Sequence, residues 1–349
     1  MKTIKITFSL LLFTLFSYAQ TVHTVDNRSQ SGAMFTDLQM AVDAAVANDI
    51  IHIHPSATGY GSIIITKKLK LVGLGHDPIT HTEGLTAKIT GISFRGNSAN
   101  SEVTGLTINS ISVATNSPAL IDADNIHIIH NKITGTISTG ANAGKNDNWI
   151  IEGNYHTNIN SSISTNADGW VVKNNVIKCT INSFNVTNFV INNIFLYTGN
   201  GTSRTFFYSL DHTVVSNNIF IASSNLTSFP ISNSPFIDMR NNITYSFSGQ
   251  TIAALPGTNN LDNTNPMFTN VPVATFDDFY NNDYSLQPAS LGHNYGTDGT
   301  DLGIFGSNFI FDTQGRPDLQ PYPIDVIINN NVIAPGQNLS VRFTAAQKP

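Results

Sequence analysis

Val190-Ile191-Asn192-Asn193-Ile194 is one of six similar segments in the middle of the chain. In each segment the first residue is apolar, the fifth is apolar or aromatic, and Asn or Gly lies between them. The other five are Ile129-His130-Asn131-Lys132-Ile133, Ile151-Glu152-Gly153-Asn154-Tyr155, Val172-Lys173-Asn174-Asn175-Val176, Val215-Ser216-Asn217-Asn218-Ile219 and Met239-Arg240-Asn241-Asn242-Ile243. Their third residues lie at 131, 153, 174, 192, 217 and 241, so the repeat averages 22 residues.

A repeat of this length has room for short strands but not for a helix. Each unit holds β-rich stretches of three to six residues separated by Asn, Gly, Ser or Thr. One unit is too small to bury its own apolar face, whereas stacked copies form a continuous core. A propeller blade needs about 40 residues and four strands, so the pattern favours a solenoid of parallel strands.

The composition agrees with an all-β chain. By count, 42 of the 349 residues are asparagine, which is poor in helix interiors and tolerates left-handed turn conformations. Charged residues make up 11% and hydrophobic residues 40%, values that exclude a disordered acidic tail and a membrane bundle. The net charge is −6 and no basic residues cluster, so we expect no nucleic-acid partner.

The N-terminus predicts export. Lys2 and Lys5 precede an apolar run from Ile6 to Phe16, and Ser17-Tyr18-Ala19 offers a small-residue cleavage site, so residues 1–19 have the features of a signal peptide. The apolar run is too short to span a bilayer, and no second long run follows. We therefore expect a secreted, periplasmic or cell-surface protein with no membrane span. The lone Cys179 excludes an intramolecular disulfide.

The repeat resembles the right-handed parallel β-helix, the fold of pectate lyases. The doubled asparagines, such as Asn174-Asn175, are similar to the stacked Asn ladder of that fold, in which amides hydrogen-bond from coil to coil. An amphipathic helix over residues 37–46, with Thr36 as N-cap, precedes an expected first strand at Ile50 to Pro55. This order resembles the capped start of many exported β-helix enzymes, including pectin methylesterases.

The C-terminal region resembles a known closing segment. Asp298-Gly299-Thr300-Asp301-Leu302-Gly303-Ile304-Phe305-Gly306 is similar to the end of secreted β-helix proteins of Bacteroidetes type. The resemblance implies three parts: a signal peptide at 1–19, an all-β right-handed parallel β-helix with an N-terminal capping helix at 34–310, and a Pro-rich segment with covering strands at 311–349.

Strand alternation predicts which side chains face solvent. The column that begins with Ile129 and Ile151 is apolar and is expected to point inward, so the column that follows it must point outward, since stacked buried charges are too costly. The outward column comprises His130, Glu152, Lys173, Ile191, Ser216 and Arg240. His130, Glu152, Lys173 and Arg240 are candidate substrate-binding residues for an extended polymer, with the two cations meeting acidic sugars. The alternative is a solvated face with weak surface ion pairs.

Two further columns offer candidate sites. Asp147, Asp168 and Asp211 each precede a strand, in a column that also holds Asn125 and Val186, and they are a candidate calcium site, although Asp at such turns also makes local hydrogen bonds. Trp149 and Trp170 occupy equivalent positions in neighbouring coils. An outward pair would stack on sugars, but alternation places both on the inward side, which predicts a role in the core.

The chain lacks the known catalytic motifs of its resembled fold. Nothing matches the paired carboxylates of pectin methylesterases, the four motifs of polygalacturonases, or the Asp-His and Arg-rich motifs of common pectate lyases. Lys173, Arg204 and Arg240 are the candidate catalytic residues if the protein removes a proton beside a uronate. We expect an exported β-helix protein that binds or acts on polysaccharide. A lyase acting on uronic-acid polymers and a non-catalytic scaffold remain alternatives, and the oligomeric state stays open.

Overall fold

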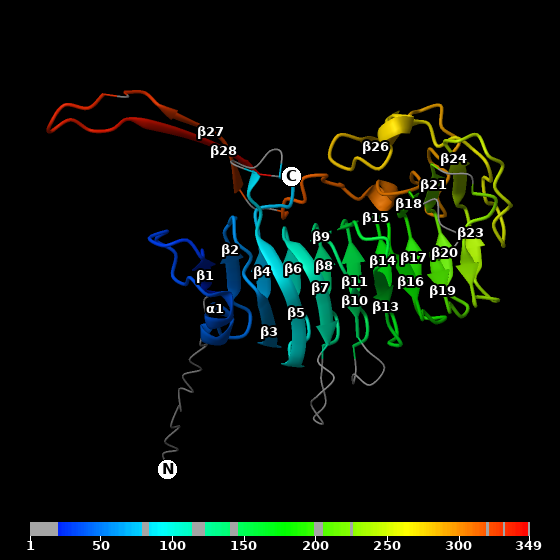
Figure 1. The fold of residues 1–349 in the computed structure, drawn as a ribbon, viewed down its shortest axis with the longest axis horizontal. Helices are drawn as coiled ribbons and strands as arrows, with labels where there is room; N and C mark the ends of the chain where they lie inside the picture. The colour runs from blue at the N-terminus through cyan, green and yellow to red at the C-terminus, as the bar shows by residue number, and fades with distance from the viewer. Residues whose placement is uncertain are drawn as a thin grey trace, which may run out of the picture.

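The computed structural model describes residues 20–78, 84–113, 123–139, 146–198, 205–223, 226–318, 321–330 and 332–347. Its secondary structure is almost entirely β, and nearly all neighbouring strands run parallel. The strands stack into a parallel β-helix whose long axis runs horizontally in Figure 1. The solenoid predicted from the repeat is therefore confirmed.

One face of the solenoid is a ten-stranded parallel sheet. Its strands, in order across the sheet, are β1 (Val22–Val25), β2 (Ile50–Ile53), β4 (Lys70–Val72), β6 (Glu102–Thr104), β8 (His127–Ile129), β11 (Ile150–Glu152), β14 (Val171–Lys173), β17 (Phe189–Ile191), β20 (Val214–Ser216) and β23 (Asp238–Arg240). Neighbouring strands belong to successive coils and lie about 4.8 Å apart.

The other two faces are branches of a 14-stranded sheet. The branches meet at the long strands β5 (Lys88–Asn97) and β7 (Thr107–Val113), and β3 (Ser62–Lys67) pairs with β5. One branch comprises β9 (Lys132–Ile133), β12 (Tyr155–His156), β15 (Val176–Ile177), β18 (Ile194–Tyr197), β21 (Ile219–Ala222) and β24 (Ile243–Ser246). The other comprises β10 (Ile137–Ser138), β13 (Ser162–Ser164), β16 (Thr180–Asn182), β19 (Phe207–Tyr208) and β22 (Ile231–Ser232).

The middle residue of each short strand of the ten-stranded sheet points into the core. Five members of the predicted inward column are fully buried: Ile151, Val172, Val190, Val215 and Met239. Ile129 was wrongly placed in this column, because Ile128 is the residue that pairs with Ile151 and Ile129 lies opposite Glu152. A register error of one residue exchanges the two faces of a strand.

An asparagine ladder fixes this register. The backbone N–H of each ladder residue donates to the Oδ1 of the next, from Asn131 to Asn154 at 2.8 Å and onward along the spine. The members are Asn131, Asn154, Asn175, Asn193, Asn218, Asn242 and Asn260. The predicted ladder is thus present; it includes the second Asn of each doubled pair, together with Asn131 and Asn154, which follow His130 and Gly153.

The first residue of each pair has a different role. Asn174, Asn192, Asn217 and Asn241 all adopt positive φ, as do Gly105, His130 and Gly153 in the earlier coils. Asn and Gly tolerate this left-handed conformation, which turns the chain from the ten-stranded sheet into the next strand. This column lies at the edge of the outer face, where the side-chain amides of its four asparagines donate hydrogen bonds to residues 295–307.

The N-terminal end carries a short helix. Helix α1 (Leu38–Ala44) packs against β1, β2 and β3, and it lies at the blue end of the solenoid in Figure 1. Its N-cap is Asp37, whose carboxylate accepts from the Met40 N–H, so the assignment of Thr36 as N-cap was wrong by one residue. The first strand of the sheet is β1, which precedes the expected start of the solenoid at residue 34.

Residues 266–318, the covering segment, pack on the outside of the solenoid. This segment is yellow to orange in Figure 1 and includes β25 (Phe268–Asn270), β26 (Asp283–Leu286) and the 3-10 turns η2 (Val273–Thr275) and η3 (Gly306–Asn308). Its side chains form a second hydrophobic core on the outer side of β15, β18, β21 and β24. That core includes Val176, Ile194, Ile219, Ile243, Phe276, Phe279, Tyr284, Leu302, Ile304 and Phe311.

The predicted covering strands beyond residue 311 form a hairpin. β27 (Pro321–Ile328) pairs antiparallel with β28 (Val341–Gln347). Among the helices and strands of the described residues, these two contact only each other. In Figure 1 the red hairpin extends away from the solenoid, so the covering role belongs to residues 266–318 instead.

Trp149 and Trp170 confirm the predicted core stacking. Both are fully buried, their ring centroids lie 4.6 Å apart, and each indole N–H donates to a backbone carbonyl. Cys179 is buried in the same core. No helix among the described residues has the length and apolar character needed to cross a membrane.

Candidate functional site

No helix or strand of the described residues packs on the outer face of β11, β14, β17 and β20, although the covering segment reaches part of it. Among helices and strands of the described residues, these four contact only their neighbours in the sheet. The first and third residues of each strand point away from the core. They form one row of Ile150, Val171, Phe189 and Val214, and a second row of Glu152, Lys173, Ile191 and Ser216.

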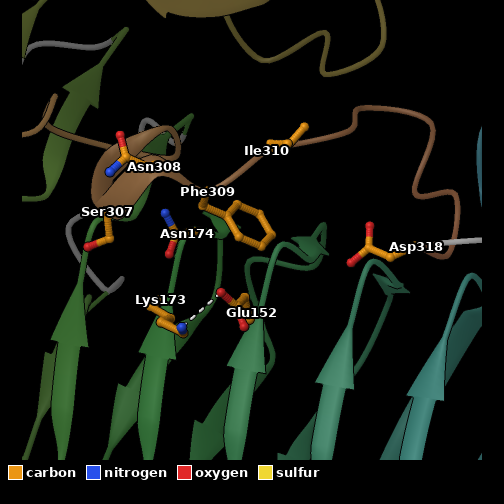
Figure 2. Close-up of a pocket in the computed structure, with 8 residues that line it drawn as sticks. All are labelled: Glu152, Lys173, Asn174, Ser307, Asn308, Phe309, Ile310 and Asp318. Atoms are coloured by element: carbon orange, nitrogen blue, oxygen red, sulfur yellow. Dashed lines mark ion pairs between the residues drawn. The ribbon is translucent and has the colours of Figure 1, made fainter. Parts of the chain in front are cut away.

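A pocket of about 300 Å³ lies where this outer face meets the covering segment (Figure 2). Its sheet side is lined by Glu152, Lys173 and Asn174. Its roof is lined by Ser307, Asn308, Phe309, Ile310 and Asp318. The pocket therefore joins two parts of the chain that lie far apart in sequence, and its volume is at the lower end of the range for small-molecule sites.

Glu152 and Lys173 form the polar floor of the pocket. The Glu152 Oε1 lies 2.9 Å from Lys173 Nζ, and the Oε2 lies 3.4 Å from His127 Nε2. Burial acts to raise the pKa of Glu152, but the neighbouring Lys173 and His127 outweigh it and hold that pKa below its ordinary value. Glu152 is therefore an ionised hydrogen-bond acceptor at neutral pH.

His130 does not lie on the outer face, which corrects its predicted place in the outward column. It adopts φ 56° in the turn after β8 and is 1% exposed. Its ring stacks on Phe309 with centroids 5.6 Å apart, and its Nε2 lies 3.3 Å from Asp318 Oδ1. His130 thus holds the roof of the pocket, and His127 is the histidine beside Glu152.

Glycine at position 153 gives Phe309 its place. Gly153 has φ 64°, and a Cβ there would lie 2.7 Å from Phe309 Cζ and 2.9 Å from His130 Nδ1. Any larger residue would push the aromatic ring away from the turn. The ring of Phe309 consequently projects over Glu152, as Figure 2 shows.

Asn174 joins the floor of the pocket to its roof. Its Nδ2 donates to the backbone carbonyls of Ile304 at 3.1 Å and Gly306 at 2.9 Å. Its Oδ1 is buried and has no hydrogen-bond partner among the described residues. Because a buried acceptor is normally satisfied, this oxygen is an open position for a donor from a bound molecule.

The predicted catalytic residues are not brought together. Lys173 and Arg240 share one row, but Ile191 and Ser216 lie between them, a separation of about 14 Å at about 4.8 Å per coil. Arg240 forms an ion pair with Asp238, and Lys173 pairs with Glu152. Arg204 lies outside the described residues. The described geometry therefore offers no paired cations around one uronate.

The aspartate column is engaged in hydrogen bonds between coils. Asp147 Oδ1 accepts from the Asp168 N–H at 3.0 Å, and Asp168 Oδ1 accepts from the Asn185 side chain at 2.7 Å. Asp211 lies beside His212, two coils from Asp168, and the exposed Val186 lies in the coil between them. Within the described residues no three His, Cys, Asp or Glu side chains form a metal-binding group. Calcium at this column stays a prediction.

Two residues of the pocket floor, Glu152 and Lys173, were predicted from the sequence, whereas the residues of its roof were not. Glu152 and Lys173 belong to the repeat, whereas Phe309 and Asp318 lie in an aperiodic segment. The one available signal was the column of turn asparagines, since outward amides in a row require partners. No protein-family model matches this chain, and no curated protein matches its sequence. Function must therefore be argued from the site itself.

Proposed function

We propose that this protein binds polysaccharide along the outer face of β11, β14, β17 and β20. The observation that carries the proposal is the uncovered row of Ile150, Val171, Phe189 and Val214, which ends beside a polar pocket. Phe189 is 38% exposed on a strand that no other helix or strand covers, so its ring is accessible. An apolar strip next to convergent polar groups suits a sugar chain, which has apolar ring faces and hydroxyl edges.

The regular spacing of the solenoid supports an extended ligand. Equivalent side chains repeat about every 4.8 Å along a rigid axis, so the four strands present a strip about 14 Å long. A linear polymer lies along such a strip without having to fold. We also propose that residues 1–19 direct export, and that the chain is a distant relative of the pectate-lyase-like β-helix proteins of Bacteroidetes type.

The charge pattern favours binding over uronate cleavage. On the outer side of the described ten-stranded sheet, Lys70 pairs with Glu102, Lys173 pairs with Glu152, and Arg240 pairs with Asp238. Each cation is thus neutralised by a neighbouring acid, and proton abstraction by Lys173 would require loss of its partner. A lyase remains a testable alternative rather than the preferred function.

Phe189→Ala tests the proposed face. We expect the dissociation constant for the best-bound polysaccharide to rise about tenfold, because the variant loses a large exposed contact surface. Affinity electrophoresis through gels that contain neutral and acidic polysaccharides measures the change. Tyr208→Ala is the matched control, since Tyr208 is also exposed but lies on the 14-stranded sheet.

Two outcomes would contradict the proposal. If no polysaccharide retards the mature protein, the scaffold function takes its place. If Phe189→Ala and Tyr208→Ala weaken binding equally, the ligand lies elsewhere. Ultraviolet absorbance with pectate, alginate and glycosaminoglycans, with and without calcium, tests the lyase alternative. A rise from unsaturated uronide ends that Lys173→Ala abolishes and Cys179→Ala preserves would show cleavage at this site.

A further inference from the structure

We propose that the pocket between Glu152, Lys173, Asn174 and Phe309 selects an uncharged sugar ring. This inference rests on the proposed function and narrows it to neutral polysaccharides. Buried polar side chains, the aromatic ring of Phe309 and the backbone of the covering segment all line this pocket. Its selectivity follows from the hydrogen bonds that its groups still need and from the charges that they already neutralise.

Asn174 contributes an unsatisfied amide oxygen to the pocket. Both partners of its amide nitrogen are backbone carbonyls, which only accept hydrogen bonds, so the NH₂ group must face the covering segment. The Oδ1 must then face the opposite side, and Figure 2 shows it directed toward Lys173 and Glu152. Asn174 is 1% exposed, so this oxygen requires a donor from a molecule inside the pocket.

Both a hydrogen-bond acceptor and a donor line the pocket with that oxygen. The Glu152 carboxylate accepts hydrogen bonds, and the Lys173 ammonium donates them. A sugar hydroxyl does both, so adjacent hydroxyls of one ring can satisfy Asn174, Glu152 and Lys173 together. The projecting ring of Phe309 supplies an apolar surface for the face of the sugar. A ligand with fewer hydroxyl groups would leave the buried acceptors unsatisfied.

Acidic side chains outnumber basic ones in the described lining of the pocket. Lys173 is neutralised by Glu152 at 2.9 Å, and Asp318 adds a carboxylate to the roof beside His130. The described lining holds Lys173 as its positive side chain and both Glu152 and Asp318 as acids. A uronate carboxylate would therefore meet two carboxylates and one paired cation. An uncharged hexose or pentose meets no such repulsion.

Binding titrations on the mature protein test the inference. The probes are uncharged oligosaccharides from cellulose, xylan, mannan and laminarin, and oligogalacturonides serve as the acidic comparison. The variants are Glu152→Gln, Phe309→Leu and Asn174→Gly. Glu152→Gln keeps the side-chain shape, and glycine at 174 keeps the positive φ of this turn. We expect each to weaken the best neutral ligand about tenfold, since charge-assisted hydrogen bonds and a buried contact are lost.

Matched controls separate a pocket effect from a folding effect. Asn241→Gly changes the same turn position, because Asn241 has φ 53° and donates to the Tyr295 carbonyl at 3.1 Å, but neither residue lines the pocket. Glu102→Gln breaks the Lys70–Glu102 pair, which has the same 2.9 Å distance on the same sheet. Both controls should bind the neutral ligand as the parent protein does.

The outcomes distinguish this inference from the proposed function. If oligogalacturonides bind more tightly than every neutral probe and their affinity falls with salt, selection of an uncharged ring is wrong, while polysaccharide binding stands. If neutral probes bind but Glu152→Gln and Phe309→Leu leave affinity unchanged, the pocket is not the site. If Asn174→Gly and Asn241→Gly weaken binding equally, the Asn174 oxygen does not contact the bound sugar. Absence of binding to all probes rejects both proposals.

Discussion

His156 is a polar residue placed inside the apolar core. It follows Tyr155 in β12, and the inward position that it occupies is held by Ile133 and Ile177 in the neighbouring coils. Neither ring nitrogen has a hydrogen-bond partner among the described residues, and the side chain is 1% exposed. Burial lowers the pKa of His156 from its ordinary 6.5 to about 3, so the ring is neutral in the folded protein.

His156→Leu should remove part of the acid sensitivity of the fold. Because the pKa in the folded state lies below that in the unfolded state, the unfolded chain takes up a proton first as the pH falls below about 6.5. The resulting loss of stability, up to about 1.4 kcal/mol per pH unit, is absent above that pH. We expect the stability of the variant relative to the parent to increase by about 2 kcal/mol from pH 7.5 to pH 5.

Urea unfolding at pH 7.5 and pH 5 measures this effect. Ile177→Val, at the neighbouring core position, is the control, since it changes the packing without changing a titratable group. Equal pH dependence in His156→Leu and the parent protein would show that the buried imidazole is not responsible.

The asparagine ladder is the element that most clearly links sequence to fold. Within it, Asn218 Nδ2 donates to the carbonyls of Val190 and Ser216, each at 2.9 Å, and Asn218 Oδ1 accepts from the Asn193 N–H at 2.8 Å. All of these groups are buried, so the ladder replaces the hydrogen bonds that water would make at the turns.

Asn218→Ala should lower the free energy of unfolding by about 3 kcal/mol or more. The variant leaves several buried backbone and amide groups without partners, and each costs about 1–3 kcal/mol. Chemical denaturation monitored by circular dichroism measures the loss. Asn270→Ala is the control, since Asn270 is exposed on β25. Losses of similar size in both variants would mean that the ladder contributes no more than a surface asparagine.

The doubled asparagines pointed to this ladder because they recur at the same turn of each coil, where a left-handed backbone favours Asn. They did not predict that the two asparagines of a pair have different roles, with Asn175 inside the ladder and Asn174 holding the covering segment. The error at Ile129 and His130 has the same origin. A segment without a doubled Asn allows two alignments one residue apart, and the buried pairing of Asn131 with Asn154 selects between them.

At the scale of the whole molecule, two hydrophobic cores lie on opposite sides of one branch of the 14-stranded sheet. The first core fills the solenoid, and the second lies between the outer side of β18, β21 and β24 and the covering segment. A segment with aromatic residues but no repeat thus completes a fold that the repeat begins. Among the helices and strands of the described residues, β27 and β28 contact only each other.

Two truncated chains test this division. A chain ending at Asp318 lacks only the hairpin and should unfold at nearly the same temperature as the full chain. A chain ending at Thr264 lacks the covering segment and exposes a continuous apolar patch around Ile194, Ile219 and Ile243, so we expect it to aggregate. Thermal unfolding and size-exclusion chromatography measure both effects. A soluble, monomeric Thr264 chain of unchanged melting temperature would show that the covering segment is dispensable.

The sequence by itself determined the parallel solenoid, the Asn ladder and the buried Trp149–Trp170 pair. These features repeat with the coil, so neighbouring copies of one pattern supply the contacts. Only the tertiary structure decided the pocket, because Phe309 and Asp318 come from a segment with no period and reach Glu152 across a long sequence separation. Local hydrogen bonding and alternation are encoded within each repeat, whereas the packing of an aperiodic chain depends on the surface that the finished solenoid presents.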